Sequence, residues 1–133
     1  MGSSPESEKV GEARLFFNPP TLAHLDLLFA WATNQDIIRH MPSMPRHLTW
    51  TEHLAWWERV RSQDGRIDRM IFLVVETGPL RCIGRVHTTF VSGELPEVGV
   101  MIGAVDLWGQ GYGARAISMM VEYLRHFGTT VDR

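Results

Sequence analysis

The chain lacks the features that mark several large classes of protein. Its 133 residues include one cysteine, Cys82, so no disulfide can form within the chain. No apolar stretch approaches the roughly 20 residues of a membrane-spanning helix, and no signal-peptide pattern is visible. These absences favour a cytoplasmic protein in a reducing compartment.

A dominant charge and a metal-binding motif are also absent. The chain has 13 Lys and Arg residues against 15 Asp and Glu residues, with a formal net charge of −2. Such a chain has no overall positive field to attract nucleic acid or an anionic membrane. Its six histidines show neither H-E-x-x-H nor a paired Cys/His spacing. We therefore expect no nucleic-acid partner, no membrane partner and no metal.

The remaining composition is typical of one globular domain. With 44% hydrophobic and 21% charged residues, a chain of this length can bury roughly two thirds of its unfolded surface. Residues 1–12 are rich in Ser, Glu and Gly and contain little that is apolar, which predicts a disordered tail. A single domain is expected over residues 13–133.

Hydrophobic periodicity and turn signals predict the order β α α β β β α. Thr49 to Glu52 fits a capping box at the start of the second helix. The expected elements are a strand over 14–17, a helix capped by Thr21, a turn or short helix over 35–40, a helix from 49, strands over 70–76, 82–90 and 97–102, and a last helix ending near 126. This order indicates an α+β fold, with a mostly antiparallel sheet and flanking helices, rather than a doubly wound sheet.

The segment from Asp106 to Ala116 is the most informative part of the sequence. Gly109, Gly111 and Gly113 occupy every second position directly before an amphipathic helix. Glycine tolerates positive φ and has no Cβ, so successive N–H groups can turn toward one bound anion at the helix N-terminus. The helix dipole favours a phosphate there. We therefore predict an anion-binding cradle formed by the glycine loop and the helix N-terminus, preceded in the chain by the strand that ends at Ile102.

The glycines have two other interpretations. Gly109, Gly111 and Ala114 also satisfy the dinucleotide spacing G-x-G-x-x-A, with Asp132 near the expected position of a ribose-binding acid. That fingerprint should follow its strand almost at once, whereas six residues separate Ile102 from Gly109, and the upstream strands form hairpins. A glycine-rich turn without a ligand is the simplest alternative.

The strand, glycine loop and helix resemble the GNAT superfamily of acyl-coenzyme A N-acetyltransferases. The family's phosphate motif is Q/R-x-x-G-x-G/A, and here Gly111 and Gly113 take the small positions while Trp108 stands in place of Gln or Arg. The Trp-Gly-Gln-Gly-Tyr-Gly version is similar to the branch of ribosomal-protein N-terminal and amino-sugar acetyltransferases. The resemblance runs from about Ala13 to the chain end.

This resemblance implies acetyl-coenzyme A as co-substrate. It implies that the pantetheine arm lies along the strand as an added β-strand, pairing with the backbone of Met101, Ile102 and Gly103. The pyrophosphate would meet backbone N–H groups between Gly109 and Ala114, with Trp108 as a lid or support. The implied binding residues of the loop and first helical turn are Trp108, Gly109, Gln110, Gly111, Tyr112, Gly113, Ala114 and Arg115, the last adding charge.

Acetyl transfer to an amine also needs a base, because an amine with a pKa of about 10.4 is mostly protonated near neutrality. Glu97 begins the strand that leads to the cradle and matches the acid that acts as base in many GNAT enzymes. Glu94 and His87, on the adjoining hairpin, are fallback candidates. A plain surface Glu on an edge strand is the structural alternative for Glu97.

The resemblance implies a small-molecule amine as acceptor, and the likeness of the early helices to those of amino-sugar acetyltransferases suggests an amino sugar or nucleotide-linked amino sugar. Protein N-terminal or polyamine acetylation, and a non-catalytic coenzyme A-binding module, are the alternatives. The loop flanked by His40, His47 and His53 is the candidate acceptor region.

Finally, the GNAT fold continues beyond Gly128, after which five residues remain here. The resemblance therefore implies that the C-terminal part of the fold is missing, including the tyrosine that protonates the leaving thiolate in many members. We expect low activity for the chain alone. An open edge beside residues 98–102 predicts a homo-oligomer formed through that edge.

Overall fold

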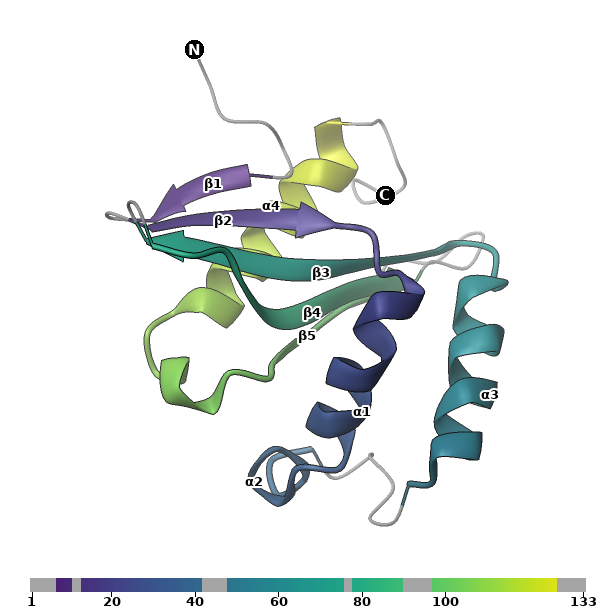
Figure 1. Ribbon diagram of the computed structural model, residues 1–133. Helices are drawn as coiled ribbons and strands as arrows, with labels where there is room; N and C mark the ends of the chain where they lie inside the picture. Colours follow the sequence, from purple (N-terminus) through teal and green to yellow (C-terminus); the bar gives the residue numbers. More distant parts are fainter. Residues whose placement is uncertain (1–6, 11–12, 42–47, 76–77, 90–96, 127–133) are drawn as a thin grey trace. The chain divides into compact units, whose positions relative to one another are not determined.

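The computed structural model describes residues 7–10, 13–41, 48–75, 78–89 and 97–126. They form the strands β1 (Ser7–Val10), β2 (Ala13–Asn18), β3 (Arg66–Val75), β4 (Arg81–Thr89) and β5 (Glu97–Ile102), the α-helices α1 (Leu25–Ala32), α2 (Gln35–Ile38), α3 (Trp50–Arg61) and α4 (Tyr112–His126), and the short 3-10 helices η1 (Leu22–His24) and η2 (Val105–Leu107) (Figure 1). The chain divides into two compact units, which we call the sheet unit (Met1–Pro19 with Ile67–Arg133) and the helical unit (Pro20–Arg66).

The sheet unit holds a five-stranded sheet in which the strands follow sequence order from β1 to β5. The pairs β1/β2, β2/β3 and β4/β5 are antiparallel. This arrangement confirms the α+β class with a mostly antiparallel sheet and flanking helices. Strand β3 begins at Arg66, four residues before the predicted start at Met70.

The structure differs from the predicted N-terminal tail at Ser7–Val10. These residues form β1 and pair with β2, from Ser7 opposite Phe16 to Val10 opposite Ala13. Strand pairing uses backbone N–H and C=O groups, so a polar segment can join a sheet edge without contributing apolar side chains. The amino-acid composition of residues 1–12 reflects side chains alone, so it does not indicate this backbone pairing. Residues 1–6 and 11–12 of the predicted tail lie outside the described residues.

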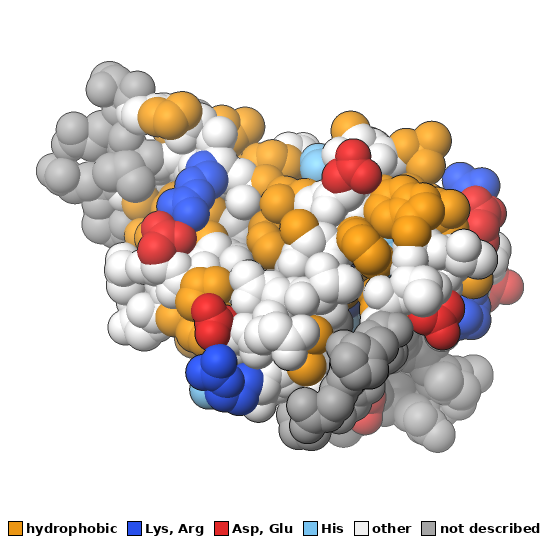
Figure 2. All heavy atoms as spheres, turned by 60° about the horizontal axis from the view of Figure 1, so that its bottom comes forward, with side chains coloured by type: hydrophobic (Ala, Val, Ile, Leu, Met, Phe, Trp, Pro, Cys, Tyr) orange, Lys and Arg blue, Asp and Glu red, His pale blue; other side chains and the backbone are white. Residues whose placement is uncertain are grey.

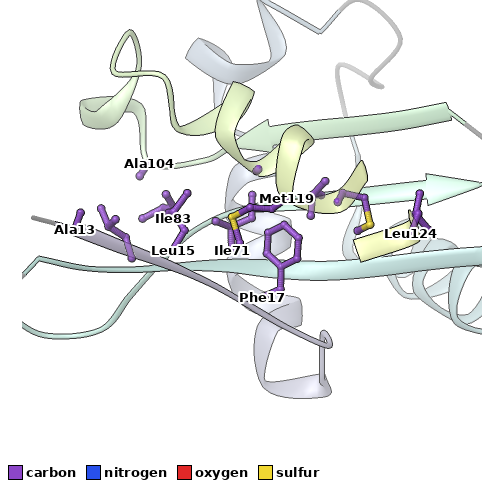
Figure 3. Packing of buried hydrophobic residues seen from close by; sticks show 12 residues of the cluster. Ala13, Leu15, Phe17, Ile71, Ile83, Ala104, Met119 and Leu124 are labelled. Carbon is purple, nitrogen blue, oxygen red and sulfur yellow. The ribbon is translucent and has the colours of Figure 1, made fainter. Parts of the chain in front are cut away.

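Helix α4 supplies one side of the hydrophobic core of the sheet unit. Its buried residues are Ala116, Met119, Met120 and Leu124, and they cluster with Ala13, Leu15, Phe17, Ile71 and Ile83 of the strands (Figure 3). Burying each large apolar side chain contributes about 1.5–3 kcal/mol. The predicted last helix is confirmed; Ala116 and Met119 are buried in it, while Ile117 and Val121 are only partly buried.

The helical unit shows the predicted cap at Thr49. The Thr49 Oγ1 accepts a hydrogen bond from the Glu52 N–H (3.2 Å), and the Glu52 carboxylate accepts one from the Thr49 N–H (2.9 Å). This capping box begins α3 and, through the hydrogen bond from the Thr49 backbone, lowers the pKa of Glu52. Thr21, the other predicted cap, precedes η1, which leads into α1.

Candidate functional site

Strand β5 ends where two consecutive residues pair with a single residue of β4. The N–H groups of Gly103 and Ala104 both donate to the carbonyl oxygen of Ile83, at 2.8 and 3.1 Å. One residue of β4 thus faces two residues of the chain after β5, which is the hydrogen-bond pattern of a β-bulge. Bulges bend a strand and end its pairing, and here the chain continues into η2 and the glycine segment.

The glycine segment has the backbone conformation that the sequence predicted. Gly109 and Gly111 have φ values of 81° and 86°, in the region that favours glycine. A Cβ built at either position would meet no atom within 4 Å, so the space beside this turn is open. Helix α4 begins at Tyr112, and its first N–H groups have no intrahelical acceptor by helix geometry. Backbone donors and an open space therefore coincide at the predicted cradle.

Two side-chain contacts tie the cradle to the sheet. The Arg81 guanidinium at the start of β4 donates two hydrogen bonds to the Asp106 carboxylate in η2, at 2.9 and 2.7 Å. The contact lowers the pKa of Asp106 and raises that of Arg81. The Trp108 Nε1–H donates to the carbonyl oxygen of Ile102, at 2.7 Å. Both contacts hold the turn next to the end of β5.

The backbone of β5 alternates between the β4 side and the open edge. Because Gly103 N–H bonds to Ile83, the alternation of an antiparallel ladder directs the backbone of Met101 toward β4 and that of Ile102 away from it. Of the three residues predicted to pair with the pantetheine arm, only Ile102 thus faces the edge. Gly103 differs from the prediction because its N–H is already bonded to β4. No described strand pairs with β5 on its other side.

The candidate bases lie on the sheet face opposite α4. Glu97 is exposed and lies opposite Thr89, while His87 lies opposite Gly99, so Glu97 and His87 occupy neighbouring positions on one face. The His87 imidazole covers Gly99, where an added Cβ would come within 2.5 Å of His87 Cε1. Glu94, the other fallback, lies outside the described residues.

The remaining predicted binding residues lie around the turn and the first turn of α4. Gln110, Ala114 and Arg115 are exposed, whereas Tyr112 and Gly113 are half-buried. The Arg115 N–H donates to the Gly111 carbonyl at 3.0 Å, which closes the first turn of the helix.

Sequence reasoning missed two polar contacts of the sheet unit. Asp68 of β3 and Arg85 of β4 form a largely buried ion pair of 2.8 Å, on the same sheet face as His87. On the α4 side, the Arg69 guanidinium donates to the Tyr123 hydroxyl at 3.1 Å and lies over the Tyr123 ring. The partners are 17 and 54 residues apart, so no local spacing signals either contact.

The structure describes two of the three histidines that flank the predicted acceptor region. His53 lies within α3, is 2% exposed, and its ring nitrogen Nε2 lies 3.2 Å from the Leu25 carbonyl oxygen. Rings of Phe29, Trp50 and Trp56 lie 5.3, 5.6 and 5.4 Å from its ring, so His53 joins helices within the helical unit. A buried His of this kind is not available to an acceptor. His40 is exposed, and His47 lies outside the described residues.

Further features of the described part of the chain concern metals, membranes and the single thiol. No cluster of metal-ligating side chains occurs in that part, and none of its helices is long and apolar enough to cross a membrane. Burial raises the pKa of Cys82 to about 11, so this thiol stays protonated near neutrality and is a poor nucleophile. Basic and acidic side chains lie side by side on the face drawn in Figure 2.

Comparison with known families gives a match along most of the chain. The sequence profile of the acetyltransferase (GNAT) domain matches residues 14–131. An uncharacterised protein of Methanocaldococcus jannaschii is 31% identical over 122 residues, which are 91% of this chain and 24% of that protein. The chain thus spans about a quarter of the length of this relative.

Solved structures share the fold. A domain from Methanocaldococcus jannaschii matches with a TM-score of 0.76 and 30% identity, over 87% of this chain and 73% of that one. Spermidine N-acetyltransferase from Vibrio cholerae, solved with CoA and spermine, matches with a TM-score of 0.65 and 14% identity, over 82% of this chain and 62% of that one. At 14% identity the likeness concerns the fold alone.

Proposed function

The chain belongs to the GNAT acetyltransferase domain family, and we propose that it transfers the acetyl group of acetyl-coenzyme A to a primary amine of a small molecule. An amino sugar or nucleotide-linked amino sugar is the proposed acceptor class. The observation that carries the proposal is the turn with positive φ at Gly109 and Gly111, placed between a bulge and the N-terminus of α4.

The turn suits the phosphates of coenzyme A for two reasons. The N–H groups at the start of α4 and the helix dipole favour an anion by about 0.3–1 kcal/mol at an exposed site. The absence of Cβ atoms at Gly109 and Gly111 leaves the backbone accessible to a bulky phosphate. Arg115, exposed on the first turn of α4, adds a positive charge nearby.

Glu97 is the proposed general base. Bound acetyl-coenzyme A supplies the thioester carbonyl, whose C–S bond breaks as the C–N bond of the amide forms. The protonated amine gives one proton to the Glu97 carboxylate, directly or through water, and attacks as the neutral amine; the second proton, lost from its nitrogen as the amide forms, reaches the leaving thiolate through solvent. His87, on the same sheet face, is the alternative base.

A product screen over amines tests the proposed function. Acetyl-coenzyme A should stabilise the protein against heat, by about 2.7 kcal/mol at 100 times its dissociation constant, whereas NAD should not. The amine panel should contain amino sugars, nucleotide-linked amino sugars, polyamines and peptides with free N-termini. Product from polyamines or peptides alone would replace the proposed acceptor.

Two further results would change the function itself. Binding of acetyl-coenzyme A without product from any amine would favour a coenzyme A-binding module without turnover. Stabilisation by NAD and not by acetyl-coenzyme A would favour the dinucleotide interpretation and reject the proposal.

A further inference from the structure

On the open edge of β5, the backbone carbonyl oxygen of Ile102 already accepts a hydrogen bond from a side chain. The carbonyl oxygen of Ile102 faces away from β4 and accepts the hydrogen bond of Trp108 Nε1–H at 2.7 Å. In an antiparallel or parallel sheet, this acceptor would receive the N–H of the next strand. The Trp108 indole therefore takes the place of a strand donor at the end of β5.

The indole lies at the surface of the sheet unit. Its side chain is 36% exposed, and Trp108 is not a member of the core formed by the strands and α4. The next residue is Gly109 with φ 81°, a position where the backbone has more freedom than at other residue types. Movement of the ring thus needs no repacking of Met119, Met120 or their neighbours.

We infer that Trp108 is a gate for the pantetheine arm of coenzyme A: the arm displaces the Trp108 indole from the Ile102 carbonyl when it adds to the edge of β5. The inference rests on the proposed function, since it concerns the binding of that same co-substrate. The arm carries amide N–H groups, which can replace the indole N–H at this carbonyl by strand addition. The ligand then selects the conformation in which the indole has left.

The gate predicts that a substitution in the binding site raises the affinity for coenzyme A instead of lowering it. Trp108→Phe keeps an aromatic ring but has no N–H to occupy the Ile102 carbonyl. Loss of one competing hydrogen bond should tighten coenzyme A binding by about two- to tenfold. Adenosine 3′,5′-bisphosphate has phosphates but no arm, so its affinity should not change. Trp50→Phe, at another partly exposed tryptophan in the helical unit, serves as the matched control and should change neither affinity.

An NMR titration follows the displacement itself. The Trp108 indole N–H signal is assigned as the one missing from the spectrum of Trp108→Phe. Coenzyme A should shift this signal and speed its hydrogen exchange, because the bond to Ile102 is broken, whereas adenosine 3′,5′-bisphosphate should leave its exchange protection intact. Thermal unfolding of the variant verifies that it is folded.

The outcomes separate the gate from the proposed function. Coenzyme A binding with an unmoved Trp108 signal, or binding that is equal or weaker in Trp108→Phe, overturns the gate and leaves the function intact. Failure of both proteins to bind coenzyme A overturns the proposed function and the gate with it. Tighter binding of coenzyme A alone, together with loss of indole protection, supports the gate.

Discussion

The two ends of strand β5 are built in different ways. At the Ile102 end, a bulge and an ion pair hold the backbone beside the glycine turn, and the Trp108 indole occupies the Ile102 carbonyl oxygen. At the Glu97 end, the candidate base is an exposed carboxylate at the first residue of the strand. One end offers backbone geometry, and the other offers a single ionisable side chain.

This difference indicates how the two parts of the reaction depend on the chain. Phosphate binding through N–H groups tolerates side-chain variation but requires particular φ values, so it should fail when glycine is replaced. Proton transfer requires one functional group, so it should fail when Glu97 is replaced while binding persists. The variants below test this division between binding at one end and chemistry at the other.

The largest expected effect is that of Glu97→Gln. Removal of a general base typically lowers turnover by about 10²–10⁴-fold, and the Ile102 end should still bind acetyl-coenzyme A normally. The deficit should shrink as the pH rises toward the pKa of the acceptor amine, because more amine is then already deprotonated. Steady-state rates from pH 6 to 10, with binding measured by calorimetry, report both quantities.

His87→Gln is the matched variant for this test, because His87 lies on the same sheet face. If Glu97 is the base, His87→Gln should retain most of its turnover across the pH range. A Glu97→Gln protein with normal rates would remove Glu97 from the mechanism, and a large loss in His87→Gln would assign the role to His87.

The sequence predicts the backbone of the glycine turn at the Ile102 end better than the contacts that position this turn. Positive φ at Gly109 and Gly111 and the start of α4 follow from local residue types, and the structure contains both. The contacts that position the turn join residues far apart in the chain, as Arg81 and Asp106 do across 25 positions. Such pairs depend on strand register, which local patterns do not specify.

The same reasoning explains where the sequence misled us. β1 was missed because its pairing involves backbone groups of a polar segment. His53 flanks the Pro- and Met-rich stretch of the predicted acceptor region and lies in the helix that the capping box at Thr49 predicts, but the structure shows that it is buried in α3. The cap fixes where the helix begins, whereas the burial of one of its side chains depends on the residues that pack against it from other elements.

The second prediction concerns Gly111→Val. A β-branched residue at φ 86° is strained by about 1–3 kcal/mol, and relief of that strain would rotate the N–H groups away from the phosphate. Acetyl-coenzyme A affinity should fall by about ten- to hundredfold. A thermal-shift titration measures it.

Gly65→Val is its control, because Gly65 also has positive φ (72°) and lies in the turn between α3 and β3. It should cost similar stability while leaving affinity unchanged. Equal affinity losses in the two variants would mean that general destabilisation, and not the cradle, controls binding.

The third prediction uses the close approach of His87 to Gly99. Gly99→Ala places a Cβ 2.5 Å from the present position of His87 Cε1, so the imidazole must move, at a cost of about 1 kcal/mol. With Glu97 as base, turnover should fall only a few-fold, and coenzyme affinity should be unchanged. The NMR signals of the His87 ring confirm the movement. A rate as low as that of a base-deleted enzyme would show that the position of His87 is essential.

The smallest expected effect is that of Asp106→Asn at the Ile102 end. The carboxylate is exposed and its ion pair with Arg81 is accessible to solvent and salt, so acetyl-coenzyme A affinity should fall only about two- to fivefold. Glu122→Gln removes an equally exposed partner of Arg125 on α4 and should not change the affinity.

The Arg81 hydrogen bonds lower the folded-state pKa of Asp106 below its unfolded value. The contact therefore stabilises the fold at pH values above the ordinary Asp pKa of about 3.9, and this contribution is lost as the pH falls through the lowered folded-state value. The difference in melting temperature between the wild-type protein and Asp106→Asn should accordingly be largest near neutrality and vanish in strong acid. A difference that grows in acid would show that the ion pair does not stabilise this end of the strand.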